Sequence, residues 1–117
     1  MLDFKKEMNK RDPLMYQLFF YCPHTHTEQV KTAVFLTGAG RIGNYNSCSW
    51  QVAGSGQFRP LAGSDAFIGE KDILETVQED RVEMICLDQH IDQAVMALKE
   101  SHPYEEVAYG VIKLEDK

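Results

Sequence analysis

The chain has 117 residues, 44% of them hydrophobic and 26% charged, a composition typical of one soluble globular domain. Its net charge is −6 and its basic residues are scattered, which argues against nucleic acid as a partner. No apolar run approaches the roughly 20 residues that cross a bilayer, and the N-terminus lacks the apolar segment of a signal peptide. The three cysteines are far apart and odd in number, so we expect reduced thiols in a cytoplasmic protein without membrane contact.

The first residues differ in character from the rest of the chain. Residues 1–12 are polar and mixed in charge, and Pro13 marks a boundary after them. We therefore expect a polar N-terminal arm over 1–12 and a single domain over 13–117. The domain opens with the apolar run 14–22, which predicts a buried strand.

A helix is predicted directly after this strand. Val30 and Val34 keep helical spacing, and either Thr25 or Thr27 is suited to be the N-cap. Gly38 then stands where a left-handed residue ends many helices.

The glycine motif GAGRIG, residues 38–43, matches the pattern G-x-G-x-x-G of dinucleotide-binding folds. In those folds a helix follows the glycines and its N-terminus holds the pyrophosphate. Here a helix precedes the motif, and the alternation of Cys48, Trp50 and Val52 predicts a strand after it. The context therefore excludes the dinucleotide interpretation and favours a helix stop followed by a turn.

The middle of the chain, residues 54–70, is rich in glycine. We expect a turn at 54–56, a short strand at 57–59, and then a long loop whose apolar residues fold back over the sheet or onto a neighbour. The next strand, 75–87, has a polar first half typical of an edge ribbon or a projecting hairpin.

The end of the chain repeats the first pattern. Apolar residues recur at helical spacing over 91–98, with Asp88 as the expected cap and Pro103 as the stop. The alternating stretch 107–114 predicts a closing strand. Two β-α-β units joined by an antiparallel hairpin predict an α+β, ferredoxin-like split β-α-β sandwich with two helices on one sheet face. The other face also carries apolar residues, so we expect a homo-oligomer.

Three motifs, GAGRIGNYNSCSW (38–50), GSGQFRPLAGSDAFIGE (54–70) and HPYEEVAYGVIKL (102–114), resemble the domain inserted in many bacterial members of the NGG-interacting-factor-three family. The resemblance covers about residues 14–114 and implies a PII/CutA-like shape, with trimers whose loops meet at subunit clefts. One departure is Gly110, where many relatives carry an acidic residue.

The same resemblance limits what is expected of the chain. In the full-length family, often described as a GTP cyclohydrolase homologue, metals are bound by the two domains that flank the insert. This chain looks like a free-standing insert, so neither the metal ligands nor the enzymatic name is carried over, and we expect no cofactor.

The densest polar cluster consists of His102, Tyr104, Glu105 and Glu106. These residues would form a ligand or ion site, with the histidine and the carboxylates as acceptors or weak metal ligands. Alternatively, the segment is a structural corner in which Pro103 stops the helix and the glutamates face water.

A second candidate is the C-x-H-x-H pattern of Cys22, His24 and His26, all residue types that bind zinc or copper. On an extended strand the three side chains would share a face, although the proline between them ends the strand. The alternative is incidental placement without a metal.

A third candidate is the glycine loop, where Arg41, Asn44 and Tyr45 follow the helix. Exposed backbone N–H groups and the arginine would hold an anion, or Arg41 would pair with Glu105 or Glu106 and pin two loops together. In either case we expect this loop to lie near the HPYEE segment, on the premise that both helices end at the same end of the sheet.

No nucleophile–base pattern supports catalysis, so we expect a non-enzymatic binding or regulatory module. It would sense a small ligand or contact a protein partner. The alternative is a metal-binding protein that uses histidines and acidic residues.

Overall fold

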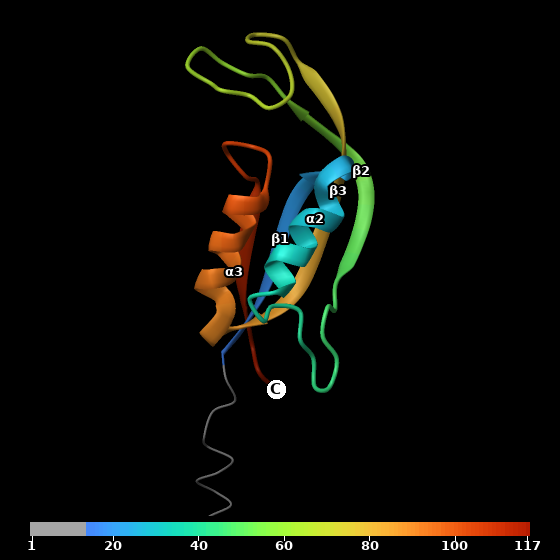
Figure 1. Ribbon diagram of the computed structural model, residues 1–117, viewed down its shortest axis with the longest axis vertical. Coiled ribbons are helices and arrows are strands. Elements are labelled where there is room, and N and C mark those ends of the chain that lie inside the picture. Colours follow the sequence, from blue (N-terminus) through green and yellow to red (C-terminus); the bar gives the residue numbers. More distant parts are fainter. Residues whose placement is uncertain (1–13) are drawn as a thin grey trace, which may run out of the picture.

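The computed structural model describes residues 14–117, so the predicted arm over 1–12 lies outside the described residues. Within this range the elements follow the predicted alternation of strands and helices (Figure 1). Their bounds are β1 Met15–Pro23, η1 His24–His26, α2 Thr27–Phe35, β2 Trp50–Phe58, β3 Glu75–Leu87, α3 Asp88–Ser101 and β4 Tyr109–Leu114.

The strands form one antiparallel sheet in the order β2-β3-β1-β4. Both helices cover the same face of this sheet (Figure 1). Met15 at the start of β1 pairs with Leu114 at the end of β4, so these two positions are neighbours. The arrangement confirms the predicted ferredoxin-like sandwich.

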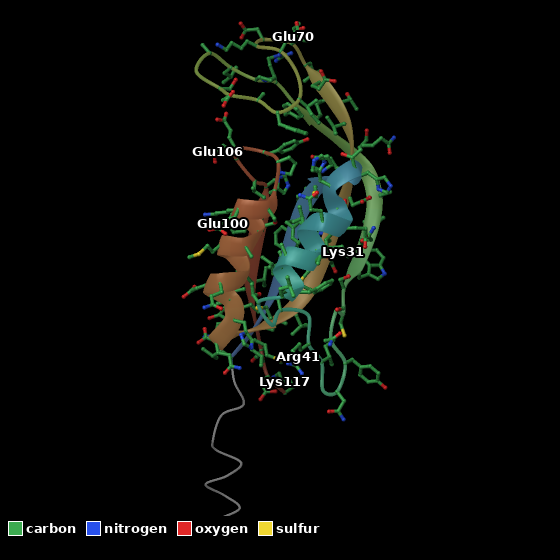
Figure 2. The ribbon with its side chains drawn as sticks, in the orientation of Figure 1. Lys31, Arg41, Glu70, Glu100, Glu106 and Lys117 are labelled. Carbon is green, nitrogen blue, oxygen red and sulfur yellow. The ribbon has the colours of Figure 1, made fainter. Side chains whose placement is uncertain are left out.

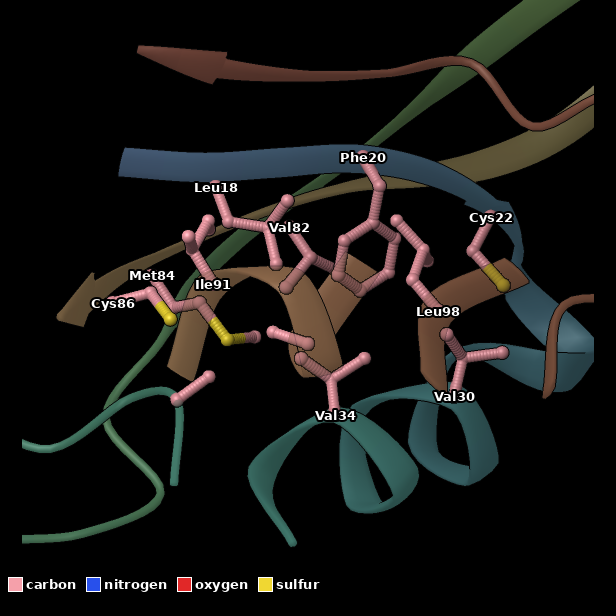
Figure 3. Packing of buried hydrophobic residues seen from close by; sticks show 12 residues of the cluster. Leu18, Phe20, Cys22, Val30, Val34, Val82, Met84, Cys86, Ile91 and Leu98 are labelled. Carbon is pink, nitrogen blue, oxygen red and sulfur yellow. The ribbon is translucent and has the colours of Figure 1, made fainter. Parts of the chain in front are cut away.

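The core lies between the sheet and the helices (Figure 3). Alternate residues of β1 face the helices, because successive side chains of a strand point to opposite sides. Burying a large side chain such as Phe20 or Leu98 stabilises the fold by about 1.5–3 kcal/mol, and both are fully buried. The cluster consists of Leu18, Phe20, Cys22, Val30, Val34, Ala39, Val82, Met84, Cys86, Ile91, Ala94 and Leu98.

β2 and β3 form a long hairpin that extends beyond the helices (Figure 1). The turn predicted at 54–56 is wrong, because pairing runs without interruption from Trp50 opposite Glu83 to Phe58 opposite Glu75. The three residues are extended and their backbone groups belong to the ladder. The projecting polar first half predicted for β3 is confirmed.

The helix ends differ in part from the prediction. The N-cap of α2 is His26, without a side-chain cap, and Thr27 is the first helical residue. Similarly, Asp88 is the first residue of α3 and not its cap. Gly38 has the predicted left-handed backbone, with φ +106°, and its amide donates to the carbonyl of Phe35. The predicted order of helix, glycine loop and strand around GAGRIG is also confirmed.

Candidate functional site

The HPYEE segment begins where α3 ends, and His102 fixes its path. His102 is buried and extended, as expected before a proline. Its Nε2 donates to the carbonyl of Tyr21 at 2.7 Å, and its Nδ1 accepts the amide of Tyr104 at 3.1 Å. Because a carbonyl only accepts and an amide only donates, both ring nitrogens are committed in the neutral tautomer. His102 thus holds Tyr104 in place and is not free to bind a ligand.

Tyr104, Glu105 and Glu106 line a pocket of about 420 Å³ together with the tip of the hairpin and the loop 59–74. This volume is within the range of small-molecule sites. The amide of Asp65 donates to Glu105 Oε1 at 2.9 Å, which ties the loop to the HPYEE segment. The predicted polar cluster is therefore part of a concave site, and three of its four members face the cavity.

Aromatic rings form much of the pocket wall. The Tyr104 ring lies 5.9 Å from that of Phe58 on β2 and 6.4 Å from that of Phe67 on the loop. Phe67 also contacts the ring of His26 at 5.3 Å, edge to face. These contacts hold the otherwise exposed loop against the body of the domain.

Two polar groups in the pocket have perturbed acidities. Burial raises the pKa of Glu79, and burial together with the charge of Glu79 raises the pKa of Tyr104 to about 12. The Tyr104 hydroxyl is buried and interacts with the Glu79 carboxylate, but it makes no hydrogen bond of good geometry within residues 14–117. A polar atom of this kind is costly to bury unless a ligand or water satisfies it.

Glu79 reaches its position because Gly56 stands beside it on β2. A β-carbon at position 56 would overlap the Glu79 carboxylate. The glycine therefore leaves room for the carboxylate to lie across the strand at the pocket wall. Neither Glu79 nor Phe67 was predicted from the sequence as a site residue. The signals that could have indicated them are the polar first half of β3, which contains Glu79, and the long glycine-rich loop, which contains Phe67.

The glycine-loop candidates are not part of this pocket. Arg41 and Glu106 lie beyond opposite ends of the helical layer (Figure 2). Gly40 binds the carbonyl of Ile85 beside the start of β1, whereas His102 binds Tyr21 near its end. The expected proximity within one chain is wrong, because α2 and α3 run antiparallel and their C-terminal ends lie at opposite ends of the sheet.

The glycine loop itself is a tight, exposed turn. Ile42 and Tyr45 exchange backbone hydrogen bonds of 2.9 and 3.0 Å around Gly43 and Asn44. Arg41 is exposed, and within residues 14–117 it pairs with neither of the HPYEE glutamates. The predicted pinning of two loops by this arginine is therefore not seen within one chain.

The C-x-H-x-H residues do not converge on one point. Cys22 is buried in the core, and burial raises the pKa of its thiol to about 11. His24 is 69% exposed and its Nδ1 donates to Asp80 at 2.8 Å. Residues 14–117 contain no group of three or more potential ligands placed to hold a metal ion. The shared strand face fails because Pro23 ends β1 and a 3-10 turn follows.

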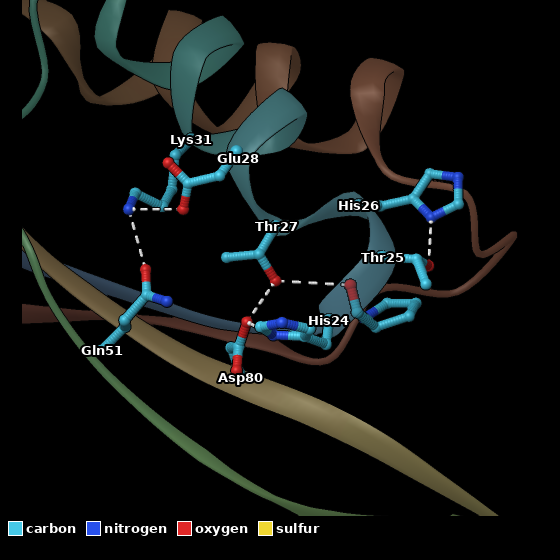
Figure 4. Close-up of polar contacts among 9 residues, drawn as sticks. His24, Thr25, His26, Thr27, Glu28, Lys31, Gln51 and Asp80 are labelled. Carbon is cyan, nitrogen blue, oxygen red and sulfur yellow. Dashed lines mark hydrogen bonds and ion pairs between the residues drawn. The ribbon is translucent and has the colours of Figure 1, made fainter.

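His24 lies instead beside a buried acid, whereas the ring of His26 bonds the Thr25 hydroxyl (Figure 4). Asp80 is 1% exposed and accepts the hydroxyl of Thr27 at 2.6 Å and the Nδ1 of His24 at 2.8 Å, both through Oδ2. Thr27 and His24 are not bonded to each other, so the three do not form a nucleophile–base–acid relay. The contacts join β3 to the start of α2.

The sheet face away from the helices is centred on Arg81. Its guanidinium lies 4.2 Å over the ring of Phe19 and donates to Tyr21 at 2.7 Å and to Glu83 at 3.1 Å. On the same face Trp50, Val52 and Ile112 remain 61%, 45% and 48% exposed. The register places them on this open face, because Trp50 pairs with Glu83, Val52 with Arg81, and Ile112 with Gln17.

Known proteins resemble this chain in sequence and in fold. The chain is 43% identical over 100 residues to "GTP cyclohydrolase 1 type 2 homolog" of Halalkalibacterium halodurans, a match over 86% of this chain and 27% of that protein. The protein of the same name from Bacillus subtilis is 44% identical over 105 residues, which is 89% of this chain and 28% of that protein. The chain thus spans about a quarter of the curated relatives it matches. No protein-family model matches it.

A solved structure, a Bacillus cereus protein related to NIF3, matches 92% of this chain and 27% of its own with a TM-score of 0.78 and 36% identity. The chain is a Nif3-like, CutA-like domain. CutA1 of Ehrlichia chaffeensis superposes on the Nif3-like domain with a TM-score of 0.66 over 92% of this chain and 87% of its own. At 10% identity this likeness concerns the fold alone. Within its described residues, no helix is long and apolar enough to cross a bilayer.

Proposed function

We propose that the Nif3-like domain is a non-catalytic binding module that takes up a small ligand in the pocket closed by the HPYEE segment. The observation that carries this proposal is the cavity of about 420 Å³ between the hairpin, the loop 59–74 and Tyr104. Its wall is largely apolar and aromatic, and the buried Tyr104 hydroxyl and the half-buried Glu79 carboxylate are among its few polar groups. This mixture is typical of ligand sites.

We further propose that the domain assembles as a homo-oligomer through its open sheet face. Exposed Trp50, Val52 and Ile112 on the same face as the stacked Arg81 support this proposal, since monomers rarely leave such a face uncovered. The CutA-like resemblance favours three copies. The free cysteines agree with a reducing compartment such as the cytoplasm.

Native mass spectrometry of protein purified without an affinity tag tests both parts. We expect about 40 kDa, three times the 13.4 kDa of one chain, together with a bound small molecule or an increase in thermal stability on adding one. A monomer would refute the oligomer proposal. Stoichiometric zinc, copper or iron would refute the metal-free ligand site and revive the metal-binding alternative. Turnover of a bound molecule would refute the non-catalytic assignment.

A further inference from the structure

We propose that the pocket selects an organic cation, an ammonium or guanidinium group carried on an apolar body. This inference rests on the proposed function, because it names the chemical class of ligand for that same site. It is argued from the charge of the lining, from the aromatic walls and from the placement of Glu79.

The lining carries an excess of negative charge. Glu79, Glu105 and Glu106 face the pocket against a single basic residue, Arg59, which is exposed at the rim. Glu105 already accepts the Asp65 amide, but within residues 14–117 neither Glu79 nor Glu106 has an ion-pair partner. An anion entering this site would meet unpaired carboxylates, whereas a cation would neutralise them.

The apolar part of the wall fits the same ligand class. The rings of Phe58 and Phe67 lie 5.9 and 6.4 Å from the Tyr104 ring between centroids. Aromatic rings attract an ammonium or guanidinium group over their faces and also bury its apolar body. The Tyr104 hydroxyl, which lies beside Glu79, adds one acceptor for an N–H group.

The position of Glu79 indicates that its carboxylate is held for binding and not for stability. It lies half-buried over Gly56 beside the Tyr104 hydroxyl, without an ion-pair partner within residues 14–117, and burial raises its pKa. A bound cation would reverse this cost, because an opposite charge favours the ionised carboxylate. Gly56 therefore acts as a positioning residue, since any side chain there would push the carboxylate away.

The test compares three probes that share a benzyl group: benzylammonium, benzyl alcohol and benzoate. Their binding to the full chain is followed by the shifts of backbone amide resonances in the pocket. We expect benzylammonium to bind at least about 10-fold more tightly than benzyl alcohol, and benzoate to bind more weakly still. Capped lysine and arginine amides are tested beside free benzylammonium; tighter binding of the capped residues would indicate that the natural cation belongs to a protein chain.

Three variants locate the effect. Glu79→Gln should weaken benzylammonium binding at least about 5-fold while leaving benzyl alcohol unchanged. Gly56→Ala should do the same although it removes no charge. Glu100→Gln, an equal charge change on an exposed position of α3, should change neither probe (Figure 2).

The outcomes separate the two proposals. If benzoate or benzyl alcohol binds at the pocket amides as well as benzylammonium, the ligand class is wrong but the binding site stands. Equal loss of all probes in Glu79→Gln would likewise overturn the cation inference. If no probe of any charge shifts these amides, both the ligand class and the proposed binding function fail.

Discussion

Replacing Thr27 by valine removes the hydroxyl that donates to Asp80 and nearly preserves the shape of the side chain. The bond is 2.6 Å long, and Thr27 and Asp80 are each 1% exposed, so water cannot replace the lost donor. Hydrogen bonds to charged groups contribute about 1.5–3 kcal/mol. We expect Thr27→Val to lower the free energy of unfolding by about 2–3 kcal/mol.

The hydrogen bond from His24 to Asp80 should contribute less to the free energy of unfolding. His24 donates to the same carboxylate oxygen but is 69% exposed, so solvent screens the pair and can replace it. Exposed pairs contribute about 0–1 kcal/mol, and His24→Ala should stay below about 1 kcal/mol. The structure thus predicts a clear order, with the threonine contributing more than the histidine.

Urea unfolding followed by far-ultraviolet circular dichroism measures both variants, at neutral pH and at one protein concentration because an oligomer's stability depends on concentration. Thr32→Val is the matched control, since the Thr32 hydroxyl is exposed and donates only to the Glu28 carbonyl of its own helix. We expect a change below about 0.5 kcal/mol for it. Equal losses for Thr27→Val and His24→Ala would refute the reasoning from burial.

Three further predictions follow from other contacts. Burial lowers the pKa of His102 below 6.5, so the unfolded chain binds a proton at a higher pH than the folded chain does. The free energy of unfolding should therefore be full above about pH 6.5 and fall below it. His102→Gln should show a smaller fall when unfolding is measured as a function of pH. A fall as steep in the variant would contradict this. Gly110→Ala would overlap the Phe19 ring and should weaken the oligomer, measured by sedimentation, so an unchanged mass would count against the open-face interface. In the folded protein a thiol reagent should label Cys48 alone, because burial raises the pKa of both core cysteines to about 11; rapid labelling of either would disprove their protection.

The elements of the fold were predictable because each depends on local periodicity. The apolar run 14–22 and the helical spacing over 91–98 are visible in the sequence, and Gly38 and Pro103 end their helices as expected. The extended conformation of residues 54–56, where we predicted a turn, was not predictable in the same way. Glycines are frequent in turns, and only the pairing with β3 keeps these residues extended.

The site was predictable only in part because its contacts join distant residues. The HPYEE segment was recognised as a polar cluster, but its pocket depends on a hairpin register that brings Glu79 beside Gly56 and on a loop that brings Phe67 to Tyr104. The expectation that Arg41 lies near the HPYEE segment was wrong within one chain. It depended on the relative direction of α2 and α3, which the topology of the sheet determines and neither motif reveals.

The pairing of Met15 with Leu114 has a consequence for how this fold can be used. Antiparallel partners of this kind lie only about 5 Å apart between Cα atoms. The first and last strands of the domain therefore enter and leave at one point, like the two ends of a closed loop. A host chain can carry such a unit between two adjacent surface residues without stretching its own backbone, and the pocket then lies at the far end, away from the point of attachment.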